Sequence, residues 1–150
     1  MMRTGFETPD QADVHALLGE LDCYLYSVYP AQCVYALDLA SLLRPNVLFA
    51  VARDAAGGAL GCGAIVVEPA YGEIKRMYVR PHARGQGVAR RLIETLEASA
   101  REGGCSTFML EAGPAQPEAL IAYERLGYRR RGPYGDYPDD PNSVFMEKRV

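Results

Sequence analysis

Two glycines, Gly85 and Gly87, lie between a short apolar run and an amphipathic helical pattern. Glycine has no Cβ, so its backbone can turn several N–H groups toward one point. The first turn of a helix adds unpaired N–H donors and a partial positive charge. Arg84, just before the glycines, can add a charge-assisted hydrogen bond. These residue types in this order are suited to binding a pyrophosphate.

Two common nucleotide-binding motifs differ from this segment. A P-loop requires Lys followed by Ser or Thr after its second glycine, whereas this chain has Val88 and Ala89 there. A dinucleotide-binding fold requires a third glycine-type position and a βαβ repeat with a downstream acidic residue, and this context is missing as well. On the glycines alone, a strand-to-helix turn that binds nothing is the alternative interpretation.

Two longer motifs follow one another along the chain. The first is Glu-Ile-Lys-Arg-Met-Tyr-Val-Arg-Pro at 73–81, followed by Arg-Gly-Gln-Gly-Val-Ala at 84–89. The second is Gln-x-x-Ala-x-x-x-Tyr-x-x-x-Gly-Tyr at 116–128. In this order they resemble the two signatures of the GNAT acetyltransferase family. Gln116 and Tyr128 replace the Asn and Phe that are common there, and the resemblance covers residues 47–149.

The resemblance implies that acetyl-CoA lies in a gap where two neighbouring strands, at 74–79 and 106–111, splay apart. Backbone groups of the first strand would pair with the pantetheine arm, the turn at 84–89 would wrap the pyrophosphate, and no metal is required. The implied cofactor-binding residues are Met77, Tyr78, Val79, Arg84, Gly85, Gln86, Gly87, Val88, Ala89, Gln116 and Tyr123.

Amide formation needs a base for the protonated amine and an acid for the departing thiolate. The resemblance implies that Tyr123 is the acid and that Glu73 is a base, directly or through water. A core tyrosine with a satisfied hydroxyl is the alternative for Tyr123. For Glu73 the alternative is a surface ion pair with Lys75, its neighbour on the same face of a strand. A backbone N–H at 77–79 would polarise the acyl carbonyl.

No motif of the sequence marks the binding site for the acetyl acceptor. In similar proteins it lies between the N-terminal helices and the loop before the last strand, where this chain has several tyrosines and aspartates. Aromatic walls with carboxylates suit a cationic amine, although half-buried tyrosines and ordinary turn residues are the plainer account. Arg76 is expected opposite in phase to Glu73, on a different wall, as a carboxylate ligand or an ion-pair residue. The candidate acceptor-binding residues are Tyr24, Tyr29, Arg76 and Tyr134. Arg129–Arg131 is interpreted as a solvated charge run, with a contact to the 3′-phosphate of CoA as the alternative.

The elements that must position these residues follow from the hydrophobic pattern. A helix is predicted from Thr8-Pro9-Asp10 to Leu25, and a long loop at 132–142, rich in Pro, Gly and Asp. Further helices are predicted at 37–43, 87–101 and 117–126, and strands at 47–52, 60–68, 73–79, 106–111 and 143–148. The fold class is therefore α+β, a GNAT-like mixed, mainly antiparallel sheet with splayed central strands, flanked by helices.

Length, charge and cysteine usage narrow the class of protein. A chain of 150 residues fits a single domain, 1–150. The net charge of −3 and the lack of a long apolar run predict neither nucleic-acid nor membrane binding. With no signal-peptide pattern, the four cysteines are expected to be reduced and the protein cytoplasmic. No metal spacing is seen among them, and the sequence leaves a homodimer open.

Together these patterns predict an acetyl-CoA-dependent N-acetyltransferase that acts by direct attack of an amine on the thioester. The expected acceptor is a primary amine on a small molecule, an amino acid or an amine. The alternatives are a protein or peptide N-acetyltransferase, a non-catalytic acyl-CoA-binding sensor, and an unrelated interaction module.

Overall fold

The centre of the molecule is a seven-stranded sheet with the strand order β1-β2-β3-β4-β5-β7-β6. The computed structural model describes residues 1–150. Every neighbouring pair is antiparallel except β4 and β5, which are parallel. The strands are β1 (Arg3–Phe6), β2 (Val47–Arg53), β3 (Ala59–Val67), β4 (Gly72–Val79), β5 (Thr107–Ala112), β6 (Arg129–Arg131) and β7 (Val144–Arg149). The predicted mixed, mainly antiparallel sheet is confirmed.

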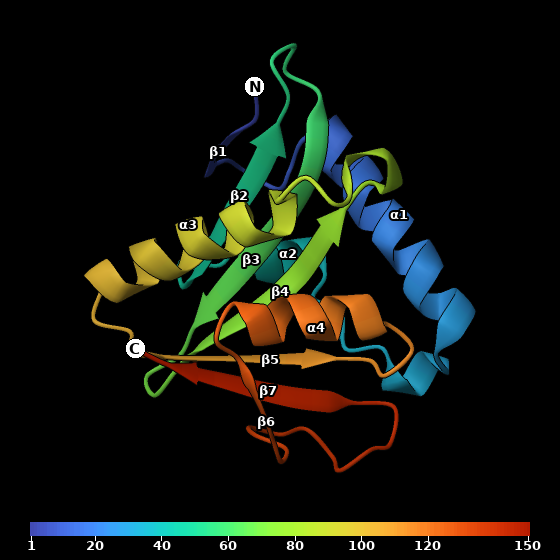
Figure 1. Ribbon diagram of the computed structural model, residues 1–150, viewed down its shortest axis with the longest axis vertical. Coiled ribbons are helices and arrows are strands. Elements are labelled where there is room, and N and C mark those ends of the chain that lie inside the picture. The colour runs from blue at the N-terminus through green and yellow to red at the C-terminus, as the bar shows by residue number, and fades with distance from the viewer.

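Four α-helices cover the two faces of this sheet (Figure 1). α3 (Val88–Glu102) and α4 (Pro117–Arg125) pack on one face, and α1 (Ala12–Val28) and α2 (Leu39–Leu42) on the other. Short 3-10 turns follow α1 at Ala31–Cys33 and β4 at Pro81–Ala83. None of the helices combines the length and the apolar character that a bilayer crossing requires.

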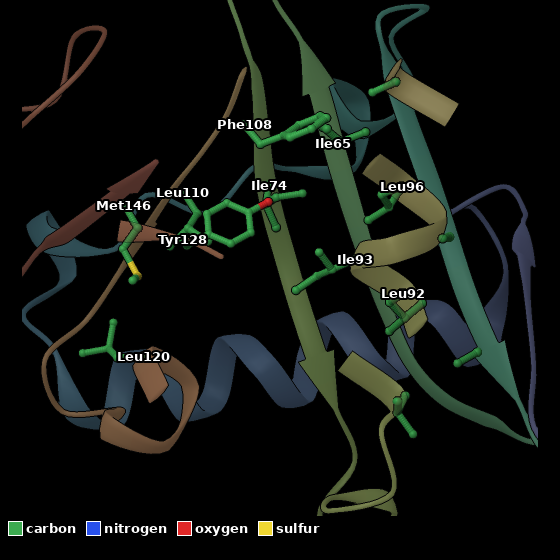
Figure 2. Packing of buried hydrophobic residues seen from close by; sticks show 14 of the residues in the cluster. Ile65, Ile74, Leu92, Ile93, Leu96, Phe108, Leu110, Leu120, Tyr128 and Met146 are labelled. Carbon is green, nitrogen blue, oxygen red and sulfur yellow. The ribbon is translucent and has the colours of Figure 1, made fainter. Parts of the chain in front are cut away.

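The core on the α3 face is the larger one, a cluster of 16 buried residues. α3 has apolar residues at helical spacing, so one stripe of its surface, including Leu92, Ile93 and Leu96, lies against the sheet. Figure 2 shows this stripe and the side chains beneath α4 on the two sides of Ile74, where β4 and β5 meet. Truncating one fully buried residue such as Leu96 to Ala would cost about 2–5 kcal/mol.

β4 and β5 pair over only three residues and then separate, as Figure 1 shows. The pairs are Gly72 with Phe108, Glu73 with Met109 and Ile74 with Leu110. Beyond Ile74 the edge of β4 that faces β5 has no strand partner. The predicted splay of the two central strands is therefore present, with α4 over one side of the gap and α1 near the other.

A β-bulge at Arg76 changes the direction of the side chains in β4. Cys62 faces Tyr78 and Ala64 faces Lys75, so β4 has one residue more than β3 between these pairs. Arg76 takes a left-handed conformation with φ of 56°, which costs a non-glycine residue about 1–2 kcal/mol. Its guanidinium pairs with Asp22 of α1 at 2.6 Å, which offsets part of that cost.

The bulge makes one sequence expectation wrong. Arg76 was expected on a different wall from Glu73, because alternate strand residues point to opposite faces. Instead Arg76 contacts α1, and Glu73 lies near α2, so both point to the face that these helices cover. The alternation rule fails here because the extra residue shifts the phase of β4.

Two strands were not predicted. β1 is four residues long and half exposed, so it lacks a burial pattern, and it pairs with β2, far along the chain. β6 is the Arg129–Arg131 segment, fully exposed at the sheet edge and paired with β7. Its charges are solvated as expected, but its backbone is a strand.

Candidate active site

The gap between β4 and β5 opens into a cavity of about 140 Å³. Its walls come from both faces of the sheet, because no strand fills the space between them. From the α4 side the cavity is lined by Gln116, Ala119 and Tyr123, and from the α1 side by Leu21, Leu25, Tyr29 and the 33–36 segment. The strands themselves contribute Ile74, Lys75, Arg76, Met77, Leu110, Glu111 and Ala112. The cavity is therefore bordered by residues from both faces of the sheet.

The turn before α3 presents unpaired backbone donors. Gly85 and Gly87 have φ of 78° and 79°, a conformation that favours glycine. The backbone N–H groups from Gly85 to Ala89 donate no hydrogen bond within the protein. A Cβ at either glycine would meet no atom within 4 Å, so the turn is open to solvent. Free N–H groups at a helix N-terminus fit an anionic diphosphate.

Side chains of this segment keep the turn in place. Arg84 donates from Nε to the carbonyl of Val79 at 3.0 Å, and Gln86 donates to the carbonyl of His82. Val88 is the first residue of α3, and its side chain is buried in the core between this helix and the sheet. Only the backbone of Val88 therefore faces the turn, while the terminal nitrogens of Arg84 donate no hydrogen bond within the protein.

The edge of β4 offers an extended backbone to the gap. Met77 and Val79 pack against the core below α3, whereas Tyr78 points to the α1 face and donates to Glu20 at 3.0 Å. On its other side this strand is held by β3. An extended ligand arm could pair with this free edge in the way a strand does.

Tyr123 lines the cavity from α4. Its ring packs edge-on against Tyr128, with ring centroids 6.1 Å apart, and its hydroxyl makes no hydrogen bond within the protein. Burial raises the pKa of Tyr123 to about 12, because the phenolate would be poorly solvated. The hydroxyl therefore keeps its proton at neutral pH and can donate it to an atom in the cavity.

Glu73 does not line this cavity. Its Oε2 accepts hydrogen bonds from the hydroxyls of Tyr134, at 2.8 Å, and Tyr137, and Lys75 Nζ lies 3.5 Å away. These contacts raise the pKa of Tyr134 and Tyr137, after the larger effect of burial. The ion pair with Lys75 foreseen as the alternative is present. Glu73 borders a neighbouring cavity near α2, which shares Tyr35 and Lys75 with the first one.

The candidate acceptor-binding residues have different positions. Tyr29 lines the cavity, accepts from the N–H of Ala115 at 3.2 Å and donates to Gln116. Arg76 lines it too, and its buried Nε has no hydrogen-bond partner. Tyr134 belongs to the Glu73 cluster, and Tyr24 is exposed and does not line the cavity.

Sequence reasoning missed Glu111, near the end of β5. It lines the cavity, and Ser143 donates to its Oε2 at 2.9 Å. Burial raises the pKa of Glu111, against the opposing effects of Ser143 and Lys75. One signal was available in the sequence, because Glu111 is a charged residue at the end of an apolar strand, directly before the Gly113-Pro114 break.

Known proteins resemble this chain in sequence and in structure. The model of the acetyltransferase (GNAT) family matches residues 14–128. An IAA acetyltransferase from Azospirillum brasilense is 46% identical over 144 residues, which are 95% of this chain and 94% of that protein.

Solved structures agree with this match. A Klebsiella pneumoniae protein assigned as an acyl-CoA N-acyltransferase has 37% identity and a TM-score of 0.88, over 99% of this chain and 97% of that one. The PaiA N-acetyltransferase of Thermoplasma acidophilum, solved in complex with coenzyme A, shares the fold at 15% identity. Its TM-score is 0.77, over 100% of this chain and 99% of that one.

Proposed function

The chain belongs to the acetyltransferase (GNAT) family, and we propose that it transfers the acetyl group of acetyl-CoA to the primary amine of a small molecule. The observation that carries this proposal is the cavity that passes between β4 and β5. With walls from both faces, it would let a donor and an acceptor approach one reaction point from opposite sides of the sheet. Direct attack of the amine on the thioester needs this arrangement, because both molecules must be bound at once.

The residues on the α3 and α4 side fit the donor. The free N–H groups at Gly85–Ala89 would hold the pyrophosphate, with Arg84 beside them. The free edge of β4 at Met77–Val79 would pair with the pantetheine arm. Gln116 and Tyr123 line the cavity where the thioester would lie. Bound acetyl-CoA would supply an activated acyl carbon with a thiolate leaving group.

Two groups of the chain would then assist the reaction. A backbone N–H of the Met77–Val79 edge would polarise the acyl carbonyl, since these groups face the gap without a strand partner. Tyr123 lines the cavity with a hydroxyl that is protonated across the neutral range, and it would donate its proton toward the sulfur as the C–S bond breaks.

The α1 side of the cavity favours a small acceptor over a peptide. The space is small and is bounded by Leu21, Leu25 and Tyr29. Arg76 lines this side and its buried Nε has no hydrogen-bond partner, so an acceptor carboxylate would pair with the guanidinium if the side chain turned from Asp22 toward the cavity. An amino acid would supply both the amine and that carboxylate. IAA is a second candidate acceptor, because the 46% identical relative is named for it.

Calorimetric titration of the purified protein with acetyl-CoA, CoA and ATP tests the donor. Acetyl-CoA and CoA should bind and ATP should not. Gly87→Glu should abolish this binding, because it puts a negative charge and backbone strain at the turn. Gly104→Glu is the matched control. Gly104 also has a positive φ and open space around it, but it follows the far end of α3, about 22 Å away.

A screen of acceptors tests the second half of the proposal. Amino acids should be acetylated faster than the amines made from them by decarboxylation, if Arg76 binds the carboxylate. IAA and a model peptide belong in the same screen, and turnover of either alone would replace the amine proposal. Acetyl-CoA binding without turnover of any acceptor would indicate a sensor, and no binding at all would contradict the donor.

A further inference from the structure

We propose that Glu111, rather than Glu73, is the catalytic base that takes the proton of the acceptor amine. This inference rests on the proposed function, because it names the base for that same reaction. The positions of the side chains support it, because Glu111 and Tyr123 line the same cavity and Glu73 does not line that cavity.

The alternation of β5 places Glu111 opposite Tyr123. Phe108 and Leu110 point into the core beneath α3 and α4, so Glu111 points to the α1 face. Tyr123 reaches the cavity from α4. An amine held by Glu111 would therefore approach the acyl carbon from one side of the sheet, while the sulfur departs toward Tyr123 on the other.

Only one carboxylate oxygen of Glu111 is engaged in a hydrogen bond, so the other is available to accept a proton. Ser143 donates to Oε2, and Oε1 has no hydrogen bond within the protein. An acceptor ammonium could thus donate to Oε1 without breaking an existing contact. Half-burial disfavours the charged carboxylate and so makes Glu111 a stronger base than an exposed glutamate.

Charged and titratable groups lie around Glu111 on several elements, including Cys33 and Tyr35 after α1 and Tyr134 and Tyr137 in the loop before β7. Lys75 of β4 lowers the pKa of Glu111, and Glu73 of β4 and Asp140 of the loop before β7 raise it. Tyr29 faces it from the end of α1. An acceptor cation would pair with Glu111 itself, because the cations that line the cavity, Lys75 and Arg76, already pair with Glu73 and Asp22.

Glu73 is occupied by other partners. Its Oε2 accepts from two tyrosine hydroxyls and lies 3.5 Å from Lys75. These contacts occupy the Glu73 carboxylate, so an acceptor ammonium would have to displace one of them to reach it. Glu73 therefore holds the loop that carries Tyr134 and Tyr137 against β4.

The proton balance of the step is complete. Glu111 takes one proton from the acceptor ammonium and releases it to solvent. The nitrogen lone pair forms the C–N bond as the C–S bond breaks, and Tyr123 gives its proton to the sulfur. The second N–H proton of the amine passes through water to Tyr123 and restores it. One proton is released in each turnover.

The test compares Glu111→Gln with Glu73→Gln, two isosteric changes on neighbouring strands. For each variant we would measure kcat/KM against pH with an accepted amine, acetyl-CoA binding by calorimetry, and the midpoint of thermal unfolding. Glu111→Gln should bind acetyl-CoA like the parent and lose about 10²-fold or more in kcat/KM near neutral pH. The loss should shrink at a pH above the pKa of the amine, where the free base already exists. Glu73→Gln should keep turnover close to that of the parent, and because the charge of Glu73 raises the pKa of Glu111, its acidic limb should move to lower pH.

Ser143→Ala gives an independent readout. Its hydroxyl stabilises the charged form of Glu111, so its removal should move the acidic limb of the profile to higher pH without abolishing turnover. An active parent with an unchanged Glu111→Gln profile, or an unmoved limb in Ser143→Ala, would overturn the role of Glu111 alone. A parent that binds acetyl-CoA but turns over no amine would overturn the proposed function and this base with it.

Discussion

At the scale of single residues, Tyr123 shows how neighbours determine which proton a side chain can move. Its ring is fixed by Tyr128, whose hydroxyl donates to the buried Glu97 at 2.6 Å. Lys148 balances the charge of Glu97 at 2.8 Å. This network uses the Tyr128 hydroxyl and leaves that of Tyr123 free. Two tyrosines five residues apart therefore have different roles, one structural and one proposed to be chemical.

Tyr123→Phe should slow turnover and leave donor binding nearly intact. The change removes only the hydroxyl, which makes no hydrogen bond that the fold requires. We expect kcat to fall by about 10²–10⁴-fold, the usual range for acid catalysis. Steady-state kinetics and acetyl-CoA titration measure the two effects, with the exposed Tyr26→Phe as control. A fully active variant would remove Tyr123 as the acid.

At the scale of elements, one close contact joins the end of α1 to the loop between β5 and α4. The Tyr29 hydroxyl approaches Gly113 so closely that a Cβ there would overlap it. Tyr29 also contacts Ala115 and Gln116. Any larger residue at position 113 would therefore clash with Tyr29. This contact closes one end of the cavity, so it sets the shape of the proposed acceptor side.

Gly113→Ala should displace Tyr29 and weaken acceptor binding. We expect a higher KM for the acceptor, little change in acetyl-CoA affinity, and a stability loss of about 1–3 kcal/mol from overpacking. Kinetics and urea unfolding give these values. Tyr29→Leu in the Gly113→Ala background should recover stability by making room. If the double variant is no more stable than Gly113→Ala, the clash does not cause the loss.

Sequence patterns predicted the elements whose burial is regular. α3 and β4 were predicted to within a residue, because one has a helical stripe and the other alternates. β1 and β6 were not predicted, because both are short and each is defined by pairing with a strand elsewhere in the chain. The β4–β5 splay could be expected only by resemblance to a family.

The part of the site that could be predicted is the part where a motif reflects a backbone conformation. The turn at Gly85 and Gly87 has the left-handed conformations that its glycines suggested. The bulge at Arg76 could not be foreseen, because a non-glycine residue gives no signal for a positive φ. Glu111 was missed for a related reason. The sequence marks it as a charged residue at the end of an apolar strand, but its place beside the cavity depends on where β4 separates from β5.

At the scale of the whole molecule, the N-terminal segments are joined by one buried cation, far from the cavity. Arg53 on β2 is 9% exposed and donates to Glu7 after β1, to Asp13 in the first turn of α1, and to Gly57 in the β2–β3 turn. Its guanidinium forms a fork that matches the Glu7 carboxylate at two points. These contacts hold α1 on the sheet, and none of the residues lines the cavity.

Arg53 should therefore make stability depend on pH without affecting catalysis. Hydrogen bonds from Arg53 lower the pKa of Glu7 and of Asp13 below their ordinary values of 4.5 and 3.8. A folded-state pKa below the unfolded value gives stability that is present above the unfolded value and lost as pH falls through the folded one.

We expect Arg53→Met to cost about 1–3 kcal/mol at neutral pH, nearer the lower figure because both carboxylates keep contact with water. The difference from the parent should shrink below about pH 4, where both carboxyls become protonated. Urea unfolding near neutral pH and in acid measures it, with Arg90→Met as control, since the Arg90–Glu94 pair is exposed. A constant difference across pH would show that Arg53 stabilises by packing alone, and a change in kcat would show that the N-terminal segments reach the site.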